Sequence, residues 1–285
     1  MLNYNYYNEG VGFDSIRKQS EAQGLKAEVN IVYGQGAVVN GGVSPQPQPQ
    51  GRSATDWYVY KDGEYSFMTP TEFATTVQAG NVVSVGTVTE GKYTPVGIVP
   101  FATNAVSDNK TRIMALNDAS EASVAWGDVN HLGEDNPTGK QYNYAFSADF
   151  DGQGNTQLIK TAGGESFEAF YPAAYAAENY KAFSNDTTSW YLPAAAECEL
   201  FLANLVSVKT EIDKYTTSLG VVFPTEGTHF WSSSEWGGKG AFCAWGWRFG
   251  TDNAGVSIYS KDNNIKGKIY NIQVRSFASS PIINS

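Results

Sequence analysis

Alternating apolar and polar positions predict β-hairpins in the first half of the chain. Residues 56–68, DWYVYKDGEYSFM, alternate on either side of a central Asp-Gly pair, which is typical of a two-residue hairpin turn. Two apolar runs, VVSVGTV (82–88) and TPVGIVPFA (94–102), flank TEGKY and predict a second hairpin with buried faces. RIMALNDAS, which begins at Arg112, predicts a further strand.

Helical spacing of apolar residues is concentrated in the middle of the chain. A short helix is also predicted earlier, with Thr69 as its cap and a proline at its first position. The segment NTQLIKTAGG should be a helix capped by Asn155 or Thr156, and helices are predicted over 171–183 and 194–212. Strands, then helices, then short strands predict an α+β fold rather than alternating βαβ units.

Residues 1–53 differ in composition from the rest of the chain. Their last part, SPQPQPQGRS, has no apolar periodicity and predicts an extended linker. The linker is either a mere spacer, or it connects to residues 1–43 that trimerise the protein or anchor it to a particle. The N-terminus lacks the basic and apolar regions of a signal peptide, and no apolar run is long enough for a membrane span. We therefore expect an N-terminal extension over 1–53 and one domain over 54–285.

Composition and charge narrow the classes of partner. Hydrophobic residues make up 41% of the chain, as in a globular protein, and the formal net charge is −10. Without a basic stripe, binding to nucleic acid or to an anionic membrane is not expected. Cys198 and Cys243 are too few for a disulfide framework. They either pair or remain buried thiols, and thiols are favoured.

The residue pattern does not favour catalysis. The two histidines, His131 and His229, are far apart and have no carboxylate pattern beside them. FWSSSEW (230–236) places three serines before Glu235, but there is no glycine elbow or histidine partner around Ser233. We expect the hydroxyls to satisfy backbone groups and Glu235 to be structural. No enzyme activity and no cofactor are predicted.

A possible metal loop lies at residues 149–155, where DFDGQGN places Asp149 and Asp151 two residues apart. The pattern resembles the start of a calcium loop, but the glutamate at its twelfth position is absent. The favoured alternative is a set of Asx turns that cap the following helix. No metal site is therefore predicted.

The C-terminal stretch 230–278 contains four of the seven tryptophans, interleaved with glycine and small polar residues. Rigid aromatic residues combined with adaptable polar ones are typical of binding surfaces. Sharply defined pieces, FWSSSEW and VRSFA, frame this stretch. Two scaffold-like motifs on either side of a segment that tolerates varied residues indicate ligand recognition rather than catalysis.

Several motifs resemble one known family. Their order along the chain is DFDGQGNTQLI, FYPAAYAAENY, SWYLPAAAECELFL, FWSSSEW, AWGWRFG and VRSFA. Over residues 80–280 the chain resembles C-type lectin-like domains of bacteria and their phages. It is especially similar to the variable proteins of diversity-generating retroelements and to related Fibrobacter and Bacteroides surface paralogues. The resemblance implies a C-type lectin-like α+β fold with two helices and small antiparallel sheets.

The resemblance also implies where a ligand would bind. In the family, mutagenic reverse transcription rewrites the last part of the chain, here residues 230–278. Strand alternation in AWGWRFG puts Trp245, Trp247 and Phe249 on one face and Gly246 and Arg248 on the other. The family keeps the first set as core and varies the second. We therefore expect Gly246 and Arg248 to contribute to the ligand face.

The following strand extends the predicted face. Ser257, Tyr259 and Lys261 alternate with residues that should point inward, so we expect these three to point outward. Four residues in loop-like contexts complete the face. The predicted ligand-binding residues are Trp236, Lys239, Phe242, Gly246, Arg248, Asp252, Ser257, Tyr259 and Lys261.

What the resemblance implies about function is a non-enzymatic receptor-binding protein at a phage tail tip. Its partners would be a bacterial surface protein or glycan and, through the N-terminus, virion tail proteins, with a homotrimer as one possible assembly. Its location would be the virion or the bacterial cell surface. The alternative is a non-diversified bacterial adhesin. A third, less favoured alternative is an oxidase related to the formylglycine-generating enzymes, which would need either a reactive cysteine pair, here Cys198 and Cys243, or metal-binding histidines in the C-terminal half.

Overall fold

The structure, a computed structural model, describes residues 51–120, 123–127, 137–140, 148–237, 243–250, 254–261, 264–265, 268–269 and 272–281. The chain divides into two units, Met1–Gln48 and Pro49–Ser285. The first unit lies outside the described residues, so the expected N-terminal extension stays a prediction. The second unit is described by itself below.

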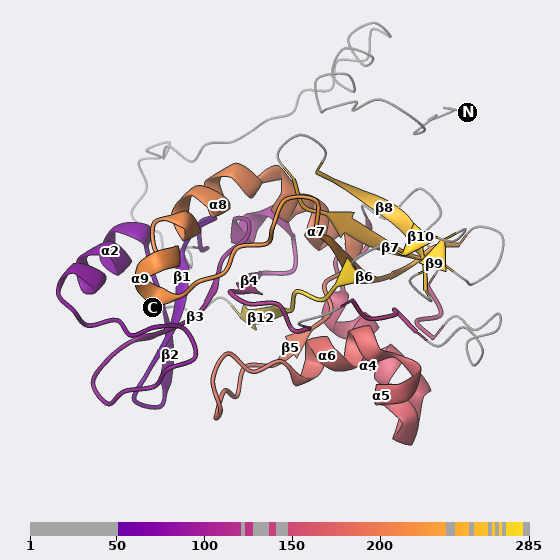
Figure 1. Cartoon of the computed structure of the whole chain (residues 1–285), viewed down its shortest axis with the longest axis horizontal. Helices are drawn as coiled ribbons and strands as arrows, with labels where there is room; N and C mark the ends of the chain where they lie inside the picture. Colours follow the sequence, from indigo (N-terminus) through magenta and orange to yellow (C-terminus); the bar gives the residue numbers. More distant parts are fainter. Residues whose placement is uncertain are drawn as a thin grey trace, which may run out of the picture. The chain divides into compact units, whose positions relative to one another are not determined.

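The larger sheet has six antiparallel strands in the order β2-β1-β3-β4-β12-β5 (Figure 1). The predicted hairpin is confirmed: it turns at Asp62 and Gly63, whose φ angles of 49° and 100° are both positive, as this turn requires. The strand predicted from Arg112 is also present, as β4. The strands are β1 (Trp57–Lys61), β2 (Glu64–Met68), β3 (Thr94–Ile98), β4 (Lys110–Ala115), β5 (Trp190–Tyr191) and β12 (Phe277–Pro281).

The second predicted hairpin is wrong. Residues 82–88 form no strand with β3, and only an isolated parallel bridge joins Val82 to Tyr93. Every residue of β3 is buried, and this strand pairs with β1 and β4 instead. Gly86 has a φ of 80°, and Val88 is 50% exposed, so the run crosses the surface as an irregular segment.

The smaller sheet has four strands in the order β11-β6-β7-β8, in which β11 runs parallel to β6 and the other pairs are antiparallel. A two-stranded ribbon, β9 with β10, follows β8 along the chain. The strands are β6 (His229–Glu235), β7 (Cys243–Arg248), β8 (Gly255–Ser260), β9 (Asn264–Ile265), β10 (Lys268–Ile269) and β11 (Ile272–Gln273).

The predicted α+β class with antiparallel sheets is confirmed, whereas the described residues contain more helices than the two that the resemblance implies. None of these helices combines the length and apolar character needed to cross a bilayer. The α-helices are α2 (Pro70–Gln78), α4 (Gly152–Gly163), α5 (Phe167–Phe170), α6 (Pro172–Asn179), α7 (Ala195–Ala203), α8 (Leu205–Asp213) and α9 (Thr216–Leu219).

Polar residues lie at three of the helix boundaries, and two of them cap the helix with their side chains. α4 begins earlier than predicted because Asp151, and not Asn155 or Thr156, caps it by accepting a hydrogen bond from the Gly154 N–H (3.0 Å). The helix predicted over 194–212 is divided into α7 and α8 at Asn204, whose backbone is not helical. The Thr69 cap of α2 is confirmed, with the reciprocal hydrogen bonds of a capping box.

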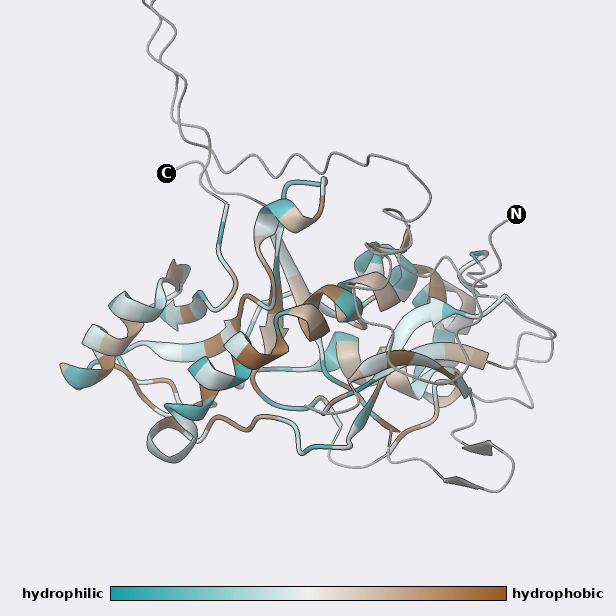
Figure 2. Ribbon diagram, turned by 90° about the horizontal axis from the view of Figure 1, so that it is seen from above, coloured by the Kyte–Doolittle hydropathy of each residue, from teal (hydrophilic) through white to brown (hydrophobic). Residues whose placement is uncertain are grey.

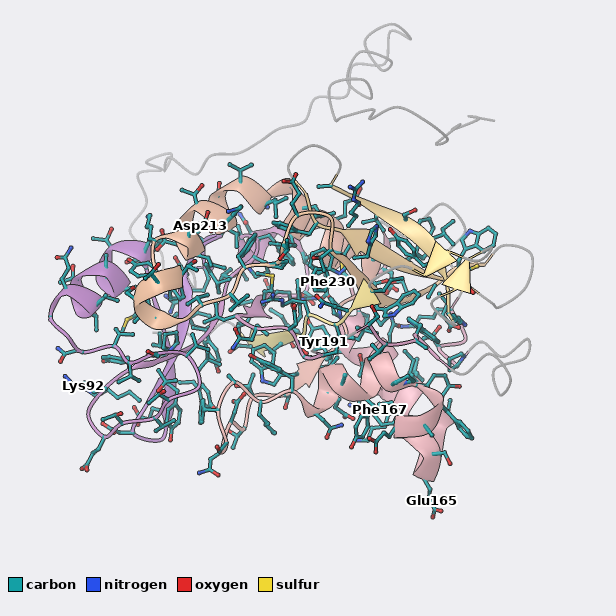
Figure 3. All side chains as sticks on the ribbon, in the orientation of Figure 1. Lys92, Glu165, Phe167, Tyr191, Asp213 and Phe230 are labelled. Atoms are coloured by element: carbon teal, nitrogen blue, oxygen red, sulfur yellow. The ribbon has the colours of Figure 1, made fainter. Side chains whose placement is uncertain are left out.

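The smaller sheet has apolar contacts on both of its faces. α7 lies against one face, where Trp247 packs edge-on against Phe201 (5.3 Å) and stacks on Phe230 (4.4 Å). A second cluster joins α4–α6 to the other face through Trp231 and Tyr259. The helices carry both apolar and polar residues along their length (Figure 2). Among the labelled side chains, Phe230 lies in the interior and Glu165 lies at the periphery (Figure 3).

The segment 272–281 contributes to both sheets, through β11 in the smaller one and β12 in the larger one. Between these strands Arg275 is fully buried, pairs with Asp118 (2.6 Å) and donates a hydrogen bond to the carbonyl of Ala115 (3.0 Å). This segment therefore ties the two sheets together.

Candidate ligand-binding site

The serines of β6 are interior structural groups. The Ser232 hydroxyl donates to the Trp245 carbonyl (2.7 Å). The Ser234 hydroxyl donates to Asp149 (2.6 Å) and accepts from the Ala195 N–H (2.8 Å). All three serines of the motif are fully buried. The prediction that these hydroxyls satisfy backbone groups is confirmed for Ser232 and Ser234, whereas the Ser233 hydroxyl accepts a hydrogen bond from the Asn155 side chain (3.3 Å).

The two carboxylates of the calcium-like motif already have protein donors. Asp149 accepts hydrogen bonds from the side chains of Asn155 (2.8 Å) and Ser234 and from the Asp151 N–H (3.3 Å). Asp151 caps α4 and pairs with Lys140 (3.2 Å). Within the described residues no group of three or more His, Cys, Asp or Glu is arranged to hold a metal ion. The geometry is that of the Asx turns expected as the alternative.

A buried ion pair lies at the end of β6 where Glu235 is. Glu235 accepts hydrogen bonds from the N–H (3.0 Å) and the hydroxyl (2.6 Å) of Thr138 and pairs with the ammonium of Lys261. That ammonium also lies over the ring of Trp126 (4.4 Å). Lys261 is fully buried, so its predicted outward direction is wrong. The chain turns after β8, and the side chain points to Glu235.

Strand register decides which predicted residues share a face. His229 on β6 lies opposite Arg248 on β7, which lies opposite Gly255 on β8. Gly246 lies opposite Ser257 in the same way and faces the same side as Arg248. The alternate residues Trp245, Trp247 and Phe249 are 5%, 0% and 1% exposed, which confirms their predicted place in the core.

Gly246 and Tyr259 are not outward-facing, and that prediction is wrong for both. Tyr259 is 6% exposed, and its ring packs edge-on against Trp231 (6.0 Å). A Cβ atom at Gly246 would lie 2.8 Å from the Tyr259 ring and 2.7 Å from the Phe230 carbonyl. The cluster from α4–α6 covers this part of the face, which alternation alone cannot reveal.

One end of this face is open. We call it the Arg248 patch; it consists of His229, Arg248, Gly255 and Ser257 and is bordered by the Tyr259 ring, which contacts His229 edge-on (5.4 Å). Ser257 is exposed, while His229 and Arg248 are half-buried. A Cβ atom at Gly255 would have no neighbouring atom within 4 Å. There is thus free space directly beside the Arg248 side chain.

Arg248 has no acidic partner in the part of the chain that the structure describes. Its Nε atom is buried and has no hydrogen-bond partner, and the ion pairs of the described residues involve other cations. The positive charge of Arg248 also affects the pKa of the neighbouring His229. Burial lowers the pKa of His229 from its ordinary value of 6.5, and the positive charge of Arg248 lowers it further. His229 is therefore neutral at pH 7, and Arg248 supplies the charge of the patch.

The pKa of His229 provides a direct test of this geometry. Arg248→Gln should raise the pKa of His229, because it removes a like charge and leaves the burial in place. NMR titration of the ring protons measures this, and His131 is the only other histidine. An unchanged pKa would contradict the contact. Because folding lowers this pKa, the associated stability is present above pH 6.5 and is lost as the pH falls through the folded-state pKa.

The other predicted residues are not at the Arg248 patch. Trp236 is half-buried beyond the opposite end of β6, where its backbone N–H donates a hydrogen bond to the Cys243 carbonyl (3.1 Å). Lys261 lies near that end too, beside Glu235. Lys239, Phe242 and Asp252 lie outside the described residues. The structure therefore brings Gly246, Arg248, Ser257 and Tyr259 together, and only Arg248 and Ser257 of these present side chains to solvent.

Sequence analysis missed two members of the patch, His229 and Gly255. Only the strand register places them beside Arg248. The one signal in the sequence was the position of His229 two residues before Trp231, on the same strand face.

The two cysteines that the oxidase alternative would use are both thiols. In the described part of the chain Cys198 and Cys243 form no disulfide. Cys198 is fully buried in α7, and burial raises the pKa of its thiol well above the ordinary range. A thiol in this environment is a poor nucleophile.

A separate shallow hollow of about 550 Å³ lies beside the start of α4. Polar and charged side chains line it, including Gln157, Glu178 and Lys181. Glu178 already accepts hydrogen bonds from Gln157 (3.0 Å) and Lys160 (3.0 Å). None of the predicted ligand-binding residues lines this hollow. The Arg248 patch, where predicted residues converge, is therefore our candidate site.

The described residues define the class as an α+β domain with antiparallel sheets. No protein-family model matches the chain, and no curated protein matches it. Among solved structures the chain is similar to a fimbrial protein from Bacteroides ovatus, with 14% identity and a TM-score of 0.44. The match covers 79% of this chain and 48% of that protein, so the chain spans about half of its length. A likeness of this degree identifies neither a family nor a function.

Proposed function

We propose that this protein is a non-enzymatic binding protein that contacts its ligand through the Arg248 patch. The supporting observation is Arg248 itself, a cation without an acidic partner among the described residues of an acidic chain, beside the uncovered backbone of Gly255. Charged groups in folded proteins are usually paired or fully solvated. A half-buried arginine that is neither is suited to a polar partner from outside.

The candidate nucleophiles of the described residues support the non-enzymatic part of the proposal. Ser232, Ser233 and Ser234 are fully buried in hydrogen bonds with other parts of the fold, and Cys198 is buried as a thiol. A nucleophile must reach its substrate and have a base beside it. All four of these groups are fully buried, so none of them can reach a substrate.

Within this class we propose a variable protein with a C-type lectin-like fold at a phage tail tip, joined through residues 1–53 to virion tail proteins. The basis is the order of six sequence motifs, each of which includes residues buried in the core or its hydrogen-bond network. The ligand would be a protein or glycan of the bacterial surface. A non-diversified cell-surface adhesin remains the second candidate.

Genomic context separates the two candidates. A reverse-transcriptase gene with an adenine-rich near-copy of the codons for residues 230–278, together with neighbouring tail genes, is expected for the first. A gene without these neighbours that encodes a lipoprotein signal would instead identify the adhesin.

Binding to whole bacteria tests the patch. We expect labelled protein to bind a subset of gut-type bacterial strains, and Arg248→Gln to weaken that binding by about tenfold or more, as loss of a central arginine does in other interfaces. Lys110→Gln, at an exposed lysine on β4, is the matched control for loss of one positive charge. Equal binding by the Arg248 variant and the wild type would refute the proposed site, provided that thermal melting shows both are folded.

A further inference from the structure

The Arg248 patch has the geometry of a subsite for one small planar anion. The Nε atom of Arg248 is buried, so solvent reaches the terminal part of the guanidinium. That part presents parallel N–H donors, which match the two oxygens of a carboxylate. The space over Gly255, the cross-strand neighbour of Arg248, is where such a group would lie.

The charge of the patch indicates a singly charged ligand group. His229 is neutral at pH 7, because burial and the charge of Arg248 both lower its pKa. Arg248 therefore has no second cation beside it among the described members of the patch. Sites for phosphate or sulfate groups usually combine several cations or backbone N–H groups. A carboxylate needs only the one guanidinium.

The surroundings of Arg248 favour a sugar over a peptide. Ser257 presents an exposed hydroxyl beside Arg248, and the half-buried His229 ring lies on the same face. These groups suit the hydroxyls of a sugar ring that rests on the side-chain-free surface of Gly255. A peptide that added a strand to this sheet would pair with the backbone of the edge strand β8, and this pairing would not need the Arg248 side chain. The patch lies on the face of the sheet, where Tyr259 fills the adjoining space.

From these observations we infer that the Arg248 patch binds the carboxylate of an acidic sugar, with the guanidinium of Arg248 as its partner and the sugar ring over Gly255. The inference rests on the proposed function and specifies its ligand.

Matched pairs of oligosaccharides provide the test. The probes end in glucuronate, galacturonate or sialate, and each partner carries the same sugar with its carboxylate reduced to an alcohol. We expect at least one acidic probe to bind the full chain about tenfold more tightly than its reduced partner, as charge-assisted pairing requires. Arg248→Gln should remove this preference, whereas Arg248→Lys should keep part of it.

Gly255→Val is the second variant because it blocks the space without changing the charge. Its Cβ would meet no atom within 4 Å, and the φ of Gly255 lies outside the left-handed region, so valine suits this strand position. We expect a folded protein that binds none of the probes. Bound acidic sugar should also raise the pKa of His229, since a negative charge arrives beside it.

The outcomes separate the inference from the proposed function. Equal affinity for acidic and reduced probes, no binding to any acidic probe, or full binding by Gly255→Val would overturn the inference. So would a preference for an acidic peptide over every sugar probe. The acidic-sugar inference can fail in this way while the Arg248 or Gly255 variant still binds bacterial cells more weakly than the wild type does. In that case the proposed function stands. If cell binding is insensitive to both replacements, the proposed function fails with it.

Discussion

Trp247→Ala is expected to lower the free energy of unfolding by about 3–5 kcal/mol, as truncation of a large buried aromatic residue usually does. Trp247 is fully buried and contacts aromatic residues from two elements, Phe230 on β6 (4.4 Å) and Phe201 on α7 (5.3 Å). Its removal leaves a cavity where the smaller sheet meets α7. Urea denaturation followed by tryptophan fluorescence and circular dichroism measures the loss.

The neighbouring residue on the same strand is the control. Arg248→Ala truncates a half-buried side chain that has no partner among the described residues, so we expect a change within about 0.5 kcal/mol. The two substitutions are one residue apart but on opposite faces of β7. Equal losses from both would show that the assignment of faces is wrong.

Glu235→Leu is expected to destabilise the domain by about 3–5 kcal/mol, because it removes the carboxylate that pairs with the buried ammonium of Lys261. Glu235 and Lys261 are 1% and 0% exposed, so water cannot replace the lost partner. The hydrogen bonds that the N–H and the hydroxyl of Thr138 donate to Glu235 are lost as well. Chemical denaturation at neutral pH measures the effect.

The double variant distinguishes a broken ion pair from a general packing defect. In the double variant, Lys261→Met also removes the buried ammonium and puts an unbranched apolar side chain in its place. We expect it to recover a large part of the loss, so that the two substitutions are strongly non-additive. Additive losses would mean that the two side chains act independently.

Local chemistry made several features predictable from the sequence. The Asp62-Gly63 turn needs positive φ at both positions, and few residue pairs allow that. Thr69 and Glu72 form a capping box that depends only on neighbours three residues apart. Two-residue periodicity places Trp245 and Trp247 on one face of β7, and the family resemblance implies that this face belongs to the core.

Features that depend on distant segments were not predictable. Alternation correctly groups Ser257 with Tyr259 on one face, but it cannot show that α4–α6 cover the part of this face where Tyr259 lies. The direction of Lys261 depends on Glu235, which lies 26 positions earlier. Likewise, β3 pairs with β1 and β4 rather than with the adjacent apolar segment 82–88, and in this position every residue of β3 is buried.

The double role of the segment 272–281 has a consequence for how the protein is made in the cell. β12 lies between β4 and β5 in the larger sheet, and Arg275 contacts Ala115, which lies 160 positions earlier. Neither sheet can be completed until this segment has left the ribosome. Long-range pairing of this kind slows folding and leaves apolar strands uncovered in the meantime. The nascent chain should therefore depend on chaperones until synthesis has passed residue 281, and a truncated product that ends before β11 should be aggregation-prone rather than a smaller functional domain.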